Sequence, residues 1–90
     1  TTPEHIEISY DNETGYEMGV YLCVGQSIHQ MDRKNAINFD HYGSFAKIQE
    51  VVQTEPVFVF LGKGIHKIKK KAEQLACEHV LTTLNQNIKP

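Results

Sequence analysis

The first 25 residues alternate hydrophobic and polar positions in two stretches, which is the pattern of two half-buried β-strands. Residues 5–10 read His-Ile-Glu-Ile-Ser-Tyr, and residues 16–25 place an apolar side chain at every second position from Met18 to Val24. The intervening residues 11–15, Asp-Asn-Glu-Thr-Gly, are typical of a turn, because Asn and Gly tolerate positive φ and Asp can bond to its own backbone. The pattern predicts an antiparallel hairpin.

The middle of the chain carries a weaker pattern. Residues 27–43 are polar and loop-like, without an internal repeat. Residues 44–54 fit a short helix or, less well, a strand; the helix is favoured because Ser44 is a good N-cap and a strand would turn Glu50 inward. The apolar positions that support the helix are Phe45, Ile48, Val51 and Val52.

The last third reads as a buried strand followed by a long helix. Residues 57–61 are apolar on both faces, which predicts a central strand, and Gly62 and Gly64 are expected to end it in a tight turn. The helix is predicted from about His66 to near Asn85, with small residues that let it lie close to the sheet. Its expected contact positions are Ala72, Ala76, Val80 and Leu84.

Charge is distributed unevenly along these elements. The 90 residues carry a net charge of −2, yet residues 1–62 hold three basic and nine acidic side chains, whereas residues 63–90 hold six basic and two acidic ones. An acidic chain is a poor general binder of nucleic acid, but it can bind through one focused patch. Five of the nine basic residues lie within residues 63–74.

The chain length, the lengths of its apolar runs and its Cys and His content argue against a multidomain, membrane-spanning or metal-binding protein. Ninety residues suffice for a single domain, 1–90, with one modest core. No apolar run approaches the roughly 20 residues that span a bilayer, and Thr1–Glu4 lack the features of a signal peptide, so we expect an intracellular protein without membrane contact whose parent chain extends upstream. Cys23 and Cys77 are expected to be buried, reduced thiols. No cofactor is expected, and no metal site is expected because the two cysteines and the five scattered histidines do not occur at the spacing of metal ligands.

The lysines near the start of the predicted helix oppose its dipole. A helix N-terminus carries about half a positive unit charge, so each nearby cation costs about 0.3–1 kcal/mol before screening. The same free N–H groups and lysine charges together suit an anion such as phosphate. The run fits a merely solvated helix face as well, but this electrostatic cost favours a polyanionic ligand.

The residues of this region resemble a known family. Residues 62–64, Gly-Lys-Gly, and residues 69–77, Lys-Lys-Lys-Ala-Glu-Gln-Leu-Ala-Cys, are similar to the C-terminal half of the double-stranded-RNA-binding domain, whose pattern is roughly G-x-G, a short loop and K-K-x-A-E-Q-x-A-A. The Glu-Gln pair is most like the copies at the C-terminus of ribonuclease III. The ungapped match covers about residues 57–84. The chain departs from the pattern at His66, where Gly is common, and at Ile68, where Ser is usual. Many family members carry a third Lys at the position of Glu73, although Glu is also frequent there in the ribonuclease III copies.

The resemblance implies an α+β fold, a three-stranded antiparallel sheet backed by helices, with a long insertion or an atypical first helix. Two threadings compete. In the favoured one, residues 5–11 and 16–25 are the first two strands and residues 27–55 are an insertion. In the other, His41 begins the family's H-x-x-x-F loop, residues 46–53 form a strand and residues 16–25 become the first helix.

The resemblance also implies a function: binding of double-stranded RNA through phosphates and duplex shape, as the substrate-binding domain of a ribonuclease III-type endoribonuclease. No catalytic constellation is visible in the chain, so any catalytic centre of such an enzyme is expected upstream of Thr1, and homodimerisation would occur through the parent chain. The alternative is a diverged domain of the same fold that acts in protein–protein contact or dimerisation. The candidate RNA-binding residues are Lys63, His66, Lys67, Lys69, Lys70, Lys71 and His41.

Overall fold

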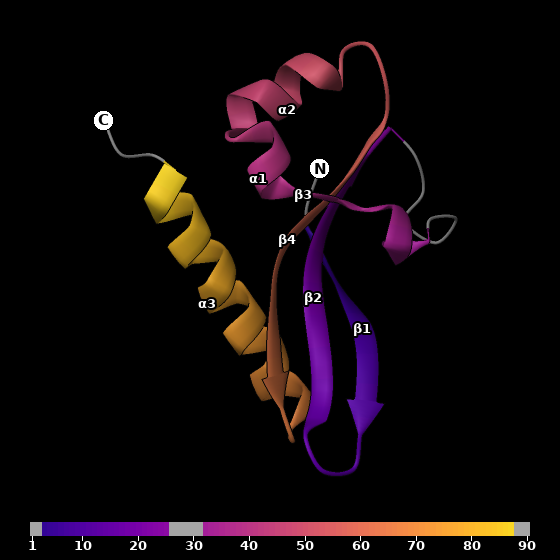
Figure 1. Cartoon of the computed structure of the whole chain (residues 1–90), viewed down its shortest axis with the longest axis vertical. Coiled ribbons are helices and arrows are strands. Elements are labelled where there is room, and N and C mark those ends of the chain that lie inside the picture. The colour runs from indigo at the N-terminus through magenta and orange to yellow at the C-terminus, as the bar shows by residue number, and fades with distance from the viewer. Residues whose placement is uncertain (1–2, 26–31, 88–90) are drawn as a thin grey trace.

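The computed structural model describes residues 3–25 and 32–87, which form a four-stranded mixed sheet with helices packed on it (Figure 1). The strands are β1 (Glu4–Asp11), β2 (Gly15–Val24), β3 (Ile37–Asn38) and β4 (Val57–His66), in the order β1-β2-β4-β3. Antiparallel pairs join β1 to β2 and β2 to β4, whereas β3 runs parallel to β4. The α+β class is confirmed. The expected three-stranded antiparallel sheet is wrong, because a fourth, parallel strand is added, and the described residues do not follow the helix-strand-strand-strand-helix order of the RNA-binding family.

The predicted hairpin is confirmed. Asp11 Oδ1 accepts hydrogen bonds from the backbone N–H groups of Glu13 (2.7 Å) and Thr14 (3.4 Å), which closes the turn between β1 and β2. Gly15 then adopts a backbone φ of 92°, which residues with a Cβ rarely adopt. Because residues 16–24 lie in a strand, the second threading, which needed a helix there, is wrong.

Two short helices follow β3 and fill the connection to β4. Helix α1 (Phe39–Tyr42) has Asn38 as its N-cap and Gly43, at φ 81°, as its C-cap. Helix α2 (Phe45–Val51) has Ser44 as its N-cap, with the Ser44 hydroxyl accepting from the N–H of Lys47. The predicted helix at 44–54 is thus confirmed in a shorter form, whereas β3 and α1 lie in the segment that had been expected to be a loop; of that segment, residues 27–31 are outside the described residues.

Strand β4 does not end at the two glycines, as had been predicted, but continues to His66. The glycines serve close packing instead of a turn. A Cβ at Gly64 would lie 2.5 Å from the backbone N of Ala76 and 2.6 Å from the carbonyl O of Ala72. Helix α3 (Lys69–Asn87) therefore approaches the strand backbone at a distance that only glycine allows, and it starts about three residues later than predicted.

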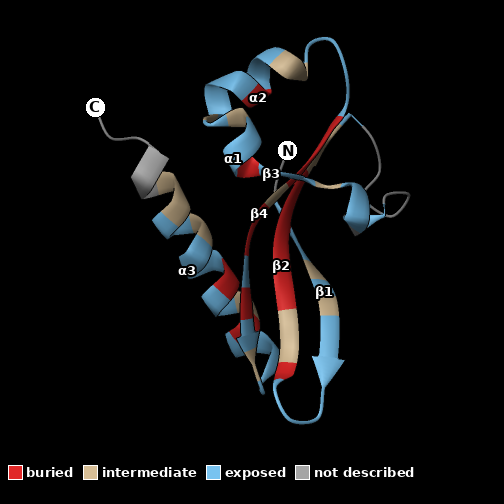
Figure 2. Cartoon of the chain, in the orientation of Figure 1, coloured by how far each residue is buried: buried red, intermediate tan, exposed pale blue. Residues whose placement is uncertain are grey.

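The core lies between one face of the sheet and the helices (Figure 2). Phe39 of α1, Ile48 of α2 and Ala76 of α3 all join the same buried cluster, so the three helices cover the same face. Full burial of a large apolar side chain contributes about 1.5–3 kcal/mol. The strand residues of the cluster are Val20, Leu22, Val57, Val59 and Leu61.

The opposite face of the sheet carries an aromatic group. Tyr21 stacks on Phe58 with ring centroids 5.4 Å apart and contacts Phe60 at the same separation in a tilted arrangement. These side chains point away from the helices because neighbours along a strand alternate between faces, and Leu22 belongs to the helix-covered core.

Candidate nucleic-acid interface

The β1–β2 turn and the start of α3 meet at one end of the molecule, and the residues around them form what we call the basic corner: Lys67, Lys69, Lys70 and Lys71 (Figure 1). Gly15 brings the two segments into contact, since a Cβ there would overlap the carbonyl oxygen of His66 and the Cα of Lys67. The absence of a side chain at Gly15 thus positions the turn beside the lysines.

The first turn of α3 presents free backbone donors together with positive charge. The carbonyl O of Ile68 accepts the N–H of Ala72 at 3.0 Å, so Ala72 is the first residue whose amide bonds within the helix. The three amides before it, at Lys69–Lys71, have no intrahelical acceptor. No acidic residue lies in this first turn. The end of α3 therefore has the electrostatic character of an anion site.

His66 helps to set this geometry. Its Nδ1 accepts a hydrogen bond from the backbone N–H of Ile68 at 3.0 Å. The bond satisfies the amide immediately before the helix and bends the chain from strand to helix within two residues. His66 is half-buried, so the structure gives it a positioning role beside the basic corner.

The lysines of the basic corner differ in their partners. Lys69 Nζ lies 3.6 Å from Glu7 Oε1, and both side chains are about half exposed. Among the described residues, Lys67, Lys70 and Lys71 have no acidic partner within ion-pair distance and are exposed. The charge available to a ligand comes first from these three.

Lys63 is not part of the basic corner. Gly64 faces α3, so the preceding side chain points to the opposite face of the sheet. There Lys63 Nζ forms an ion pair with Glu17 Oε2 at 2.9 Å, and Glu17 Oε1 also accepts from the Ser9 hydroxyl at 3.1 Å. The structure gives Lys63 an internal partner and separates it from the other candidate lysines.

His41 is also separated from the corner. It lies in the last turn of α1 and contacts Tyr42 edge-on, with ring centroids 5.3 Å apart. Helix α1 lies well away from the hairpin turn along the long axis of the molecule (Figure 1). The candidate set thus divides into a corner of four lysines with His66, and two outlying residues.

Sequence reasoning missed the acidic and histidine partners of the lysines. Glu7 and Glu17 lie on the hairpin, and their pairing with Lys69 and Lys63 follows from strand register and helix position rather than from spacing in sequence. His79 is exposed, and its Nδ1 accepts a hydrogen bond from the backbone N–H of Lys63 at 2.9 Å, a contact that spacing in sequence does not reveal. The alternation of residues 5–10 predicted only that Glu7 lies on the polar face of its strand, so it carried no signal for the contact with Lys69.

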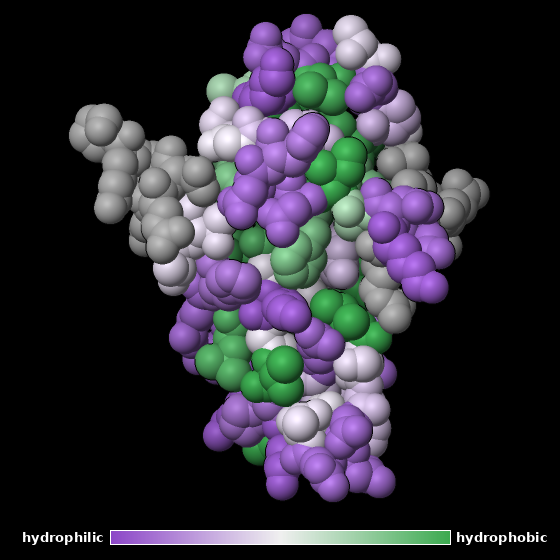
Figure 3. All heavy atoms as spheres, viewed as in Figure 1, coloured by the Kyte–Doolittle hydropathy of each residue, from purple (hydrophilic) through white to green (hydrophobic). Residues whose placement is uncertain are grey.

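Apolar side chains lie among the polar ones at this end of the fold. Tyr10, Ile65 and Ile68 are each about half exposed, and Figure 3 shows mainly hydrophilic atoms at this end with apolar atoms beside them. Tyr10 packs against Tyr16 with ring centroids 4.7 Å apart. Such aromatic and aliphatic groups extend the contact area that the lysines offer.

The two cysteines do not lie where they were expected. Cys77 is exposed and Cys23 is half-buried, so the prediction of two buried thiols is wrong. Burial, with a smaller contribution from the nearby Glu4 carboxylate, raises the pKa of the Cys23 thiol above its usual value. Ala72 and Ala76 take the buried contact positions of α3, and Cys77, next to Ala76, stays exposed beside β1, with its Sγ 3.3 Å from Nε2 of His5.

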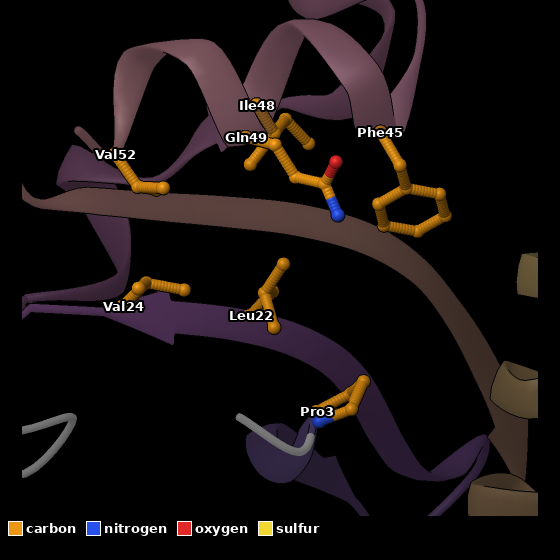
Figure 4. Close-up of a pocket in the computed structure, with 7 residues that line it drawn as sticks. All are labelled: Pro3, Leu22, Val24, Phe45, Ile48, Gln49 and Val52. Atoms are coloured by element: carbon orange, nitrogen blue, oxygen red, sulfur yellow. The ribbon is translucent and has the colours of Figure 1, made fainter.

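A second surface feature is an apolar hollow of about 400 Å³ between α2 and the end of β2 (Figure 4). Phe45, at 39% exposure, and Pro3 stand at its border. Leu22 and Val24 form its floor and Val52 one side, so the hollow exposes part of the core near α2.

Within residues 3–25 and 32–87, no three His, Cys, Asp or Glu side chains gather to hold a metal ion, and no helix is both long and apolar enough to cross a membrane. Comparison of the chain with protein-family models, with curated proteins and with solved structures found no match. The resemblance to the double-stranded-RNA-binding domain therefore rests on the sequence between residues 57 and 84 alone.

Proposed function

We propose that this chain binds double-stranded RNA through the basic corner, with Lys67, Lys70 and Lys71 as the main phosphate contacts. The observation that carries the proposal is the start of α3: three consecutive lysines, three amides without intrahelical acceptors, and no acid in the first turn. Lysines at this position oppose the helix dipole, and a bound anion would stabilise them, above all Lys70 and Lys71, which have no acidic partner among the described residues.

Duplex RNA suits this surface better than a small anion does. An RNA duplex offers phosphates on two strands beside a deep major groove that side chains cannot read, so a binder recognises shape and backbone. The basic corner distributes positive charge along the segment from Lys67 to Lys71. The β1–β2 turn lies beside this segment, because Gly15 contacts the backbone of His66 and Lys67. Sequence-specific recognition is not expected from such contacts.

The remaining candidates have lesser roles in this proposal. Lys69 contributes to binding after it leaves Glu7, and His66 fixes the direction in which α3 starts. Lys63 and His41 contribute little to the interface, because the first is paired on the opposite face and the second lies on α1.

The direct test measures the affinity of Lys70→Glu/Lys71→Glu for a fluorescent RNA duplex by anisotropy. We expect a loss of at least about tenfold, and a log–log salt dependence that is shallower by about two, since each phosphate contact contributes close to one. Lys47→Glu is the matched control: Lys47 is 57% exposed on α2, and within residues 3–25 and 32–87 its ion pair is a 4.0 Å contact to Glu50. Equal affinities for the two variants, with unchanged circular dichroism, would contradict the proposal.

A second candidate function is contact with another copy of the chain through the apolar hollow beside α2. The exposed Phe45 and the open Leu22–Val24 floor favour it, because exposed apolar area is stabilised by a partner surface. Sedimentation without RNA distinguishes the two functions. A concentration-dependent dimer that Phe45→Ser abolishes, together with no shift of duplex RNA, would favour dimerisation over RNA binding.

A further inference from the structure

Cys77 and His5 form a thiol–imidazole pair on the surface of the molecule, away from the phosphate contacts proposed above. The Sγ of Cys77 lies 3.3 Å from Nε2 of His5, although the two residues are 72 positions apart in sequence. Both side chains belong to exposed residues. A thiol within hydrogen-bond reach of a base is the arrangement from which an activated nucleophile is made.

Secondary structure holds both members of the pair in place. His5 lies in β1, paired opposite Val20 of β2, and Cys77 lies in the middle of the 19-residue helix α3. The Glu7–Lys69 ion pair joins the same strand to the same helix two turns earlier. Because both residues lie in regular secondary structure that packs on β2 or β4, the approach of Sγ to Nε2 does not depend on a loop.

The other cysteine has the opposite environment. Cys23 is half-buried, and its burial together with the Glu4 carboxylate raises its pKa, which lowers the fraction present as the nucleophilic thiolate. The fold thus contains two thiols in one molecule, one exposed with an imidazole beside it and one half-buried with a raised pKa.

We propose that Cys77 is a modification site that reacts selectively with low-molecular-weight disulfides of the glutathione type, with His5 as its positioning base. Nε2 of His5 takes the proton from Sγ, and the thiolate attacks one sulfur of the disulfide. A new S–S bond forms at Cys77 while the bond in the small disulfide breaks, and the departing thiolate receives the proton. Cys77 is oxidised and half of the small disulfide is reduced, so no further oxidant is needed.

The test treats the whole folded chain with oxidised glutathione and follows each cysteine by mass spectrometry. We expect Cys77 to form the mixed disulfide first, and His5→Gln to slow this reaction about two- to tenfold, the rate equivalent of one hydrogen bond, while the rate at Cys23 stays the same. His41→Gln, which changes a histidine on α1, is the control and should react as the wild type does.

Two results would overturn the proposal. One is equal rates at Cys77 and Cys23 in the wild-type chain, a comparison that needs no substitution. The other is an unchanged Cys77 rate in His5→Gln when circular dichroism shows that the variant is folded. If His5→Gln unfolds, the wild-type comparison together with Cys77→Ser still tests the proposal. Cys77→Ser should lose the fast phase of mixed-disulfide formation, which belongs to Cys77, and keep the slow phase, which belongs to Cys23. None of these outcomes depends on RNA binding.

Discussion

The close approach of α3 to Gly64 makes a prediction that links stability to the proposed interface. In Gly64→Ala the new Cβ would lie 2.5–2.6 Å from the N of Ala76, the O of Ala72 and the Cβ of Leu75. Ordinary contacts begin near 3.4 Å, so the helix must move by close to 1 Å relative to the strand. Two of the three atoms are backbone, and no side-chain rotation can relieve the overlap.

The magnitude follows from the general cost of overpacking, about 1–3 kcal/mol, reduced by the roughly 0.5–1 kcal/mol that alanine gains over glycine in a strand. For a domain of this size 1 kcal/mol corresponds to about 4–8 °C in Tm. The net cost is then about 0–2.5 kcal/mol, and at the middle of this range, about 1.25 kcal/mol, we expect Gly64→Ala to lower the Tm by about 5–10 °C in a calorimetric or circular dichroism melt. It should also weaken binding of duplex RNA, because a shifted α3 carries the lysines of its first turn with it.

Gly62→Ala is the matched comparison. It lies on the same strand and also faces α3, but its nearest contacts, to Val80 and His79, are 3.0–3.1 Å. A shift of a few tenths of an ångström accommodates the methyl group there, and the expected loss is under about 1 kcal/mol. If Gly64→Ala proved as stable as Gly62→Ala, the reasoning that glycine is required by the helix backbone would be refuted.

Two further predictions concern ionisable groups. Glu7→Gln should raise the affinity for duplex RNA about two- to fourfold in anisotropy titrations, because it frees Lys69 from an exposed ion pair worth less than about 1 kcal/mol; Glu50→Gln on α2 should not change it. Because the pKa of Cys23 is raised in the folded chain, the unfolded chain loses this thiol proton at a lower pH than the folded chain does. The neutral thiol therefore contributes its full stability below the ordinary thiol pKa of 9.0, and this contribution is lost as the pH rises through the pKa of the folded chain. Urea melts should show a steeper alkaline loss of stability for the wild type than for Cys23→Ser, and parallel losses would contradict the assignment.

The elements that the sequence predicted correctly are those with a strong local signal. Alternation over residues 5–10 and 16–25, with turn residues between them, determines the hairpin almost without tertiary help. The same is true of α2, for which Ser44 supplies the cap, and of the i+4 row of α3, in which Ala72 and Ala76 are fully buried.

The elements that were missed depend on contacts between distant segments. A two-residue strand such as β3 has no periodicity, and it exists because β4 offers hydrogen bonds at Val59 and Phe60. The glycines of β4 were interpreted as turn residues because a sequence does not reveal that a helix backbone lies against them. For α1, the Asn38 and Gly43 caps were readable signals, although a four-residue helix falls below the length at which hydrophobic spacing is informative.

The candidate site was predictable in its charge but not in its partners. The lysine triplet and its position at a helix start came from sequence, and the structure confirms that Lys69–Lys71 occupy the first turn of α3. The neutralisation of Lys63 and Lys69 by Glu17 and Glu7 depends on which strand faces which residue. The assignment of RNA as the ligand remains a prediction.

The hydrogen bond from the Lys63 amide to His79 has a consequence for solubility. Among the residues that the structure describes, β3 pairs with β4 only at Val59 and Phe60, and no other described strand lies along that side of β4, so a strand of another molecule could pair there. The His79 imidazole occupies one of the amides that such a strand would need, at 2.9 Å. A side chain from α3 thus bonds the Lys63 amide in place of a neighbouring strand, which leaves one donor fewer for edge-to-edge pairing at this position.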